Sequence, residues 1–107
     1  MEQGMDNLLH LLGSCKVACN YCFNACLQEK DVQMMTKCIK LDKDCAEMCG
    51  LALSFVASNS TFRNDVLRLC ATICEACAEE CGKFPEDHCQ QCAKACQECA
   101  EACKAFL

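Results

Sequence analysis

Apolar and small residues recur along the chain at steps of three and four, with charged and amide side chains between them. Such steps average about 3.5 residues, the period of one face of an α-helix in a bundle. Short polar stretches at residues 29–31 and 58–60, and the segment around Pro85, interrupt this period. The pattern therefore predicts four helices and no strands.

Capping residues place the first two helices. Asp6 or Asn7 is expected to cap a helix that runs to about Gln28, because Asp and Asn side chains accept hydrogen bonds from the free N–H groups at a helix start. Asp31 is expected to cap the second helix, over residues 32–57.

Two further helices are placed by similar signals. The polar cluster at residues 58–60 supplies the cap of a third helix over residues 61–81, and Gly82 fits the position after its end. Pro85 suits the first turn of a fourth helix, because proline has no N–H group to satisfy there. We expect this helix to end near residue 105.

Four helices of ~20–25 residues joined by short loops predict an all-α fold, the antiparallel up-down-up-down four-helix bundle. A chain of 107 residues is of the size of one domain. We therefore expect a single bundle domain over residues 1–107.

Cysteine takes most of the core-facing positions that Leu, Ile and Val fill in an ordinary bundle. The chain has 16 cysteines, and in residues 15–26, 70–81 and 89–103 they follow the steps of three and four. At ~100° per residue, each run of four cysteines falls within about a 60° arc of its helix. The sequence thus predicts a cysteine-lined core made by Cys15, Cys19, Cys22, Cys26, Cys38, Cys45, Cys49, Cys70, Cys74, Cys77, Cys81, Cys89, Cys92, Cys96, Cys99 and Cys103.

Charge and hydropathy narrow the possible partners and the compartment. The formal net charge is −5 with no basic stripe, which argues against nucleic-acid binding. No apolar run is long enough to span a membrane, and residues 1–6 carry no leader signal, so we expect a cytoplasmic protein. Thiols stay reduced in that compartment, which favours metal binding over disulfides.

Thiolate is a soft ligand that selects Cu(I), Zn(II) or iron–sulfur clusters. Cysteines three or four apart on a helix have Cβ atoms ~5–6 Å apart, so two sulfurs can bracket one Cu(I) ion and each can bridge to the next. A Cu(I) ion that replaces one thiol proton leaves the charge unchanged, whereas four Zn(II) ions on sixteen thiolates leave a buried net charge of −8. The run C-x2-C-x2-C of iron–sulfur ferredoxins is absent. We therefore predict multiple Cu(I) ions per chain, with Zn(II) as the alternative.

The two ends of the predicted tube differ in chemistry. One end holds Met34, Met35 and His88, whose thioether and imidazole groups are candidate Cu(I) ligands at an entrance. His10 is expected to lie at the opposite end without a role in metal binding. That opposite end is an apolar plug of Leu8, Leu11, Leu12, Ala52, Val56, Val66, Leu67 and Phe106.

The second helix carries two features that the sequence leaves open. Asp42 lies on the cysteine stripe and is either an inward carboxylate with hydrogen-bond or ionic partners or a residue turned to the edge of the bundle. A second apolar stripe on this helix either packs inside one bundle or forms an interface between copies of the chain. It consists of Leu41, Met48, Leu51 and Phe55.

Three cysteine motifs, at residues 19–26 (CNYCFNAC), 74–83 (CEACAEECGK) and 88–96 (HCQQCAKAC), resemble those of the bacterial copper storage proteins. The resemblance covers essentially the whole chain, and the leader-free N-terminus looks like the cytosolic branch of that family. It implies a four-helix bundle that holds many Cu(I) ions on cysteine, an entrance at the end bearing Met or His, and a homotetramer. Met34, Met35 and His88 match the entrance by location only, and Asp42 departs from the cysteine pattern.

The resulting functional hypothesis is a non-enzymatic Cu(I) store or buffer. The alternatives are a copper chaperone, which needs one exposed and exchangeable site rather than sixteen core cysteines, and a Zn(II)-binding protein. An enzyme is not expected, because the sequence offers no nucleophile–base pair, no phosphate loop and no open metal site with a general base.

Overall fold

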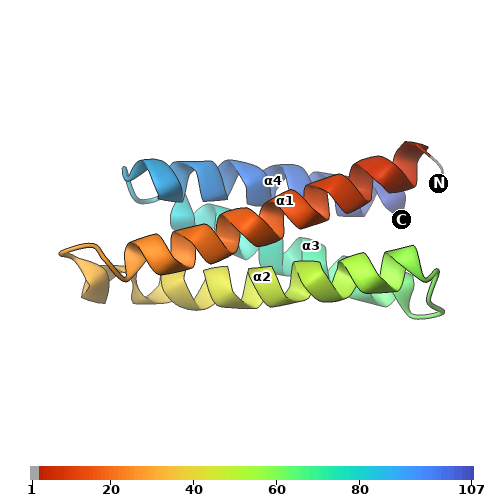
Figure 1. Cartoon of the computed structure of the whole chain (residues 1–107), viewed down its shortest axis with the longest axis horizontal. Coiled ribbons are helices and arrows are strands. Elements are labelled where there is room, and N and C mark those ends of the chain that lie inside the picture. The colour runs from red at the N-terminus through yellow and green to blue at the C-terminus, as the bar shows by residue number, and fades with distance from the viewer. Residues whose placement is uncertain (1–2) are drawn as a thin grey trace.

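Four helices lie side by side along the long axis of the molecule in the computed structural model, which describes residues 3–107 (Figure 1). Met1 and Glu2, which belong to the stretch 1–6 on which the expectation of a cytoplasmic protein partly rests, lie outside the described residues. The helices are α1 (Gln3–Cys26), α2 (Thr36–Ala57), α3 (Arg63–Cys81) and α4 (Asp87–Phe106), and a short 3-10 helix, η1 (Val32–Met35), precedes α2.

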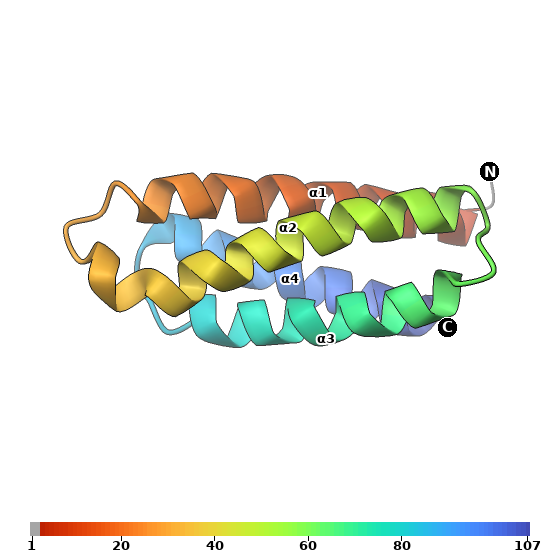
Figure 2. The ribbon, with the colours of Figure 1, turned by 90° about the horizontal axis from the view of Figure 1, so that it is seen from below.

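The helices form the predicted antiparallel up-down-up-down bundle. Each helix packs against two others, α1 and α3 both against α2 and α4. The two chain ends and the α2–α3 connection lie at one end of the bundle, and the α1–α2 and α3–α4 connections lie at the other (Figures 1 and 2). Residues 3–107 contain no strand and no helix that is long and apolar enough to cross a membrane.

The predicted cap of the first helix is wrong. α1 begins at Gln3, so Asp6 and Asn7 lie inside the helix. Asp6 falls in its first turn, where a negative charge is favourable beside the positive end of the helix dipole. The helix ends at Cys26 rather than Gln28, because the chain turns there.

The second and third helices both start later than expected. Residues 32–35 form the 3-10 helix η1 rather than α-helix, and Asp31 makes no side-chain capping hydrogen bond. α3 starts at residue 63 rather than 61. Asn59 adopts a left-handed backbone with φ of 53°, and the Phe62 N–H donates to Ser60 Oγ at 3.0 Å. The Ser60 hydroxyl therefore stabilises the connection instead of capping the helix.

The α3–α4 connection matches the prediction in part. α3 ends at Cys81 as expected, but Pro85 lies before α4, which begins at Asp87. Gly82 has an ordinary right-handed backbone with φ of −63°. A Cβ atom there would lie 3.0 Å from the Ala78 carbonyl oxygen, so close approach is what favours glycine at this position.

Gly50, inside α2, leaves room for a lysine from the neighbouring helix. Lys16 on α1 donates from Nζ to the Ala46 carbonyl oxygen at 3.1 Å. A Cβ atom at residue 50 would lie 2.9 Å from that Nζ. The contact ties α1 to α2 at half their length, beside the cysteine core.

The core changes character along the bundle. Sulfur fills most of its length, and apolar carbon closes the end that holds the chain termini, as predicted. In this plug Leu8, Leu12, Ala52, Val56 and Leu67 are buried. Leu11, Val66 and Phe106 are half-buried around them.

Candidate metal centre

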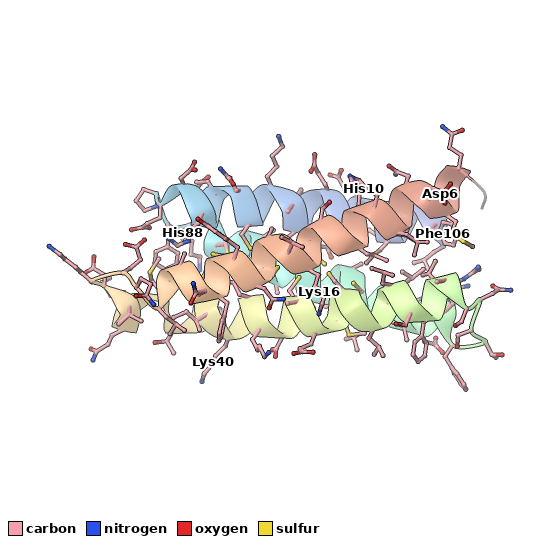
Figure 3. The ribbon with its side chains drawn as sticks, in the orientation of Figure 1. Asp6, His10, Lys16, Lys40, His88 and Phe106 are labelled. Atoms are coloured by element: carbon pink, nitrogen blue, oxygen red, sulfur yellow. The ribbon has the colours of Figure 1, made fainter. Side chains whose placement is uncertain are left out.

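All sixteen cysteines point into the bundle and have no exposed surface. Each is a free thiol. The 3.5-residue spacing of each helix brings its cysteines to the central axis, and Figure 3 shows sulfur atoms between the helices. The predicted cysteine-lined core is therefore confirmed.

The sulfur atoms of different helices lie in contact across the core. Cys19 and Cys96 approach to 3.5 Å between their Sγ atoms, and so do Cys45 and Cys74. Cys38 Sγ lies 3.0 Å from the sulfur of Cys81. Tertiary packing thus turns four separate stripes into one continuous column of thiols.

The sulfurs form overlapping groups of four, with the ligand atoms of each group within 4.8 Å of one another. Cys15, Cys19 and Cys96 each belong to two of the three groups below, so neighbouring groups share sulfurs. An ion held in one group would therefore be bridged to an ion in the next. These groups are Cys15, Cys49, Cys74 and Cys99; Cys15, Cys19, Cys45 and Cys96, here the inner tetrad; and Cys19, Cys77, Cys92 and Cys96.

Asp42 is completely buried and faces the sulfur column, so the interpretation that it turns to the bundle edge is wrong. Its Oδ1 accepts hydrogen bonds from the thiols of Cys77 (3.3 Å), Cys81 (3.3 Å) and Cys92 (3.2 Å). Its Oδ2 lies 3.8 Å from Cys38 Sγ. Burial away from water is the largest effect on Asp42 and raises the pKa of its carboxyl group to about 8. The carboxyl group therefore belongs to the core and carries a proton near neutral pH.

Two thiols at the end of the bundle that holds the α1–α2 and α3–α4 connections, those of Cys26 and Cys89, also favour their protonated form. Burial is the largest effect on Cys26 and raises the pKa of its thiol to about 11. Burial likewise raises the pKa of the Cys89 thiol. Metal that binds at these cysteines must displace their protons.

His88 lies at the start of α4, at the end of the bundle that holds the α1–α2 and α3–α4 connections (Figure 3). Its Nδ1 lies 3.5 Å from Cys22 Sγ, 3.6 Å from Cys89 Sγ and 3.9 Å from Cys26 Sγ. Its Nε2 lies 2.8 Å from Glu29 Oε2. The sequence predicted His88 at the entrance but gave no sign of Glu29, whose approach depends on how the α1–α2 connection folds back. Cys22, Cys26, Cys38 and Cys89 form a further group of four here, the mouth tetrad.

The two methionines of the predicted entrance have different surroundings. Met35, in η1, is 1% exposed and belongs to the core cluster. Met34 is 75% exposed. The thioether of Met34 is therefore accessible to metal at the surface, whereas that of Met35 is packed in the core.

His10 lies on α1 and is exposed, well away from the end that holds His88 (Figure 3). Both histidines line a groove of about 740 Å³ between α1 and α4, with Gly13, Val17 and Tyr21 between them. His10 thus provides an imidazole away from the mouth tetrad, with which the effect of His88 on metal loading can be compared.

The second apolar stripe of α2 is only partly covered. Leu41 and Met48 are half-buried against the core, Phe55 is half-buried, and Leu51 is 46% exposed. Part of the stripe therefore packs inside the bundle, and the remainder is available at the surface.

Comparison with known proteins gives a consistent result. The family model described as copper storage protein (Csp) matches residues 1–107. The uncharacterized cysteine-rich protein YhjQ of Bacillus subtilis (strain 168) is 46% identical over 94 residues, which cover 88% of this chain and 87% of that protein.

Solved copper storage proteins are similar to the chain in both fold and sequence, as two of them illustrate. The Cu(I)-bound copper storage protein BsCsp3 has a TM-score of 0.92 and 45% identity, covering 96% of this chain and 97% of that one. A cytosolic copper storage protein from Streptomyces lividans, solved during copper loading with five coppers, has a TM-score of 0.93 and 35% identity, covering 98% of this chain and 92% of that one.

Proposed function

Because this chain belongs to the copper storage protein family, we propose that it binds and stores many Cu(I) ions on the cysteine thiolates of its core. The observation that carries the proposal is the sharing of sulfurs between neighbouring groups of four. A thiolate that bridges two Cu(I) ions uses such sharing, and Cu(I) is the soft ion that suits thiolate ligands. The ligands are the sixteen cysteines that line the tube.

The Zn(II) alternative fits this arrangement less well. A structural zinc site is a closed tetrahedral set of four ligands. Groups that share Cys15, Cys19 and Cys96 cannot all be filled as independent sites of that kind. Four Zn(II) ions on sixteen thiolates would also leave negative charge in the core. Asp42, the aspartate buried there, is acidic and cannot compensate that charge.

We also infer that the protein is a store rather than a chaperone or an enzyme, and that residues 1–107 act as one storage domain. A chaperone exchanges metal at an exposed site, whereas every cysteine of this chain is fully buried. The number of Cu(I) ions bound per chain decides the matter, since one or two ions would favour a chaperone. The cytosolic location of the Streptomyces lividans relative supports a cytoplasmic location for this protein.

We propose that Cu(I) enters at the end that bears Met34, Met35 and His88. Replacing these residues together by Leu, Leu and Phe is expected to slow both loading and removal of Cu(I) by chelators about 10-fold, with little change in final capacity. The reason is that weak ligands near the surface pass ions inward, while the cysteines below bind more strongly. Stopped-flow transfer from a coloured Cu(I) chelator measures both rates.

The variant His10→Ala is the control for this experiment, because it removes an exposed imidazole outside the mouth. Its rates are expected to equal those of the unchanged protein. Equal slowing in both variants, or unchanged rates in the triple variant, would place the entrance elsewhere.

We further propose that the chain forms a homotetramer, as the family resemblance implies. Exposed apolar side chains outside the core, among them Leu51 on α2 and Val17 and Tyr21 on α1, are available for contacts between copies. Sedimentation at micromolar concentration is expected to give a mass about four times that of one chain. Leu51→Glu should shift the distribution toward smaller species if α2 contributes to the contact, and a purely monomeric wild type would contradict the proposal.

A further inference from the structure

Glu29 lies on the outer side of His88, opposite the sulfurs. Its Oε2 is 2.8 Å from His88 Nε2. The Glu29 side chain is 34% exposed and the His88 side chain 13%. Glu29 belongs to the connection after α1, where its own N–H donates to the Cys26 carbonyl oxygen at 3.1 Å. A hydrogen-bonded turn therefore holds the carboxylate over the start of α4.

The carboxylate determines which imidazole nitrogen carries the hydrogen. An ionised carboxylate only accepts hydrogen bonds, so Nε2 must be the donor in this contact. In the neutral ring Nδ1 is then left with a free lone pair. That lone pair faces Cys22 Sγ at 3.5 Å and Cys89 Sγ at 3.6 Å, where an arriving ion would meet nitrogen and sulfur together.

We propose that Glu29 is a positioning residue for the loading of Cu(I): it holds His88 with Nδ1 directed at the mouth tetrad as a ligand for the first incoming ion. This inference rests on the proposed storage function. A carboxylate behind a metal-binding histidine fixes the orientation of the ring and increases the basicity of its ligand nitrogen, and loss of such partners typically weakens metal binding 10- to 100-fold.

Two other roles for the same contact must be separated from this one. Glu29 and His88 could simply tie the α1–α2 connection to α4, as partly exposed ion pairs do at little energetic gain. The carboxylate could also attract cations to the mouth by its charge alone. Neither role requires His88 to be a ligand, so a double-mutant cycle distinguishes them from positioning.

The cycle uses Glu29→Ala, His88→Phe and the double variant, each given one equivalent of Cu(I) in competition with a chromophoric chelator. Glu29→Ala is expected to weaken binding of the first ion about 10-fold. The double variant should bind no more weakly than His88→Phe alone, because Glu29 acts through the imidazole. Glu29→Gln should retain most of the wild-type affinity, since its amide oxygen still accepts from Nε2 while the charge is gone.

A second measurement identifies directly which nitrogen of the His88 ring carries the hydrogen. In ¹⁵N NMR spectra of the reduced, metal-free protein, His88 should appear as the Nε2–H form in the wild type and in Glu29→Gln, and as a mixture of forms in Glu29→Ala. His10 provides an internal reference in every spectrum, because it is exposed and remote from Glu29. Glu75→Ala is the matched control, since Glu75 pairs with Lys104 on the surface.

Three results would overturn the positioning role. They are an unchanged His88 form in Glu29→Ala, an unchanged first affinity in that variant, and an effect of Glu29→Ala that persists in the His88→Phe background. Failure of the storage function itself would appear differently, as a total of only one or two Cu(I) ions on the wild type.

Discussion

Reduced, metal-free protein titrated anaerobically with Cu(I) is expected to bind on the order of sixteen ions per chain, because each ion that replaces one thiol proton leaves the buried charge unchanged. The sixteen thiols form a continuous column in which sulfurs are shared between neighbouring groups. Competition with a strong chromophoric Cu(I) chelator gives the number of ions bound per chain, as the amount of Cu(I) added before the chelator begins to bind Cu(I). A plateau at one or two ions would contradict storage.

Replacing the inner tetrad (Cys15, Cys19, Cys45 and Cys96) by alanine tests whether capacity follows the thiols. The number of ions bound is expected to fall by about four, since each lost thiolate removes the charge that compensates one ion. Alanine is smaller than cysteine and leaves cavities that cost stability. Circular dichroism therefore has to show a folded bundle before the count is interpreted.

The matched variant replaces the mouth tetrad (Cys22, Cys26, Cys38 and Cys89) by alanine. An equal loss of capacity is expected, together with slower loading, because these cysteines lie beside His88 at the entrance. Loss of all binding in either variant would mean that the core fills as one indivisible cluster. No loss in either variant would exclude thiolate storage.

The stability of the metal-free protein is expected to fall as the pH rises from about 4 toward 8, owing to Asp42. The ordinary pKa of an aspartate side chain is 3.8, whereas burial raises that of Asp42 to about 8 in the folded protein. Below pH 4 both states hold the proton, and the group imposes no penalty. Between the two pKa values the unfolded chain has released the proton and the folded protein retains it, so increasing pH favours unfolding.

This difference in pKa corresponds to roughly 6 kcal/mol of unfolding free energy at 1.36 kcal/mol per pKa unit. Asp42→Asn cannot ionise, so its stability should lack this decline and exceed that of the wild type increasingly toward pH 7.5. Urea unfolding of reduced protein between pH 4 and 7.5 gives the comparison. Asp44→Asn is the control, because Asp44 is exposed on the same helix. Parallel pH profiles for wild type and Asp42→Asn would contradict the prediction, because they would mean that the pKa of Asp42 does not change on folding.

The helices and the sulfur core could be predicted from the sequence, because both follow from local periodicity. A spacing of three and four fixes which residues share a helix face, whatever the neighbours are. The ends of the helices were less predictable. Asp6 and Asn7 have the chemistry of caps but lie inside α1, and Pro85 lies before α4 rather than within it. Short-range signals at helix ends compete with the packing of whole helices, which the sequence does not display.

Candidate site residues were predictable to the extent that they lie on a stripe. The sequence placed all sixteen cysteines in the core, and the structure agrees. It also put His88 near the cysteines of one end, and the observed distances from Nδ1 to sulfur agree. Met34 and Met35 could not be told apart, since adjacent residues of a connection differ in burial only once the connection has folded.

The sequence by itself therefore determined the fold class, the thiol-lined face of each helix and the preference for a soft metal ion. The tertiary structure alone decided how the four faces meet. It showed that cysteines from different helices share groups of four, that Asp42 faces inward to accept three thiol hydrogen bonds, and that Glu29 reaches His88 from another part of the chain. The reason is physical. Helix periodicity is a property of neighbours along the chain, whereas ligand groups and hydrogen-bond partners depend on the rotation and register of helices packed against one another.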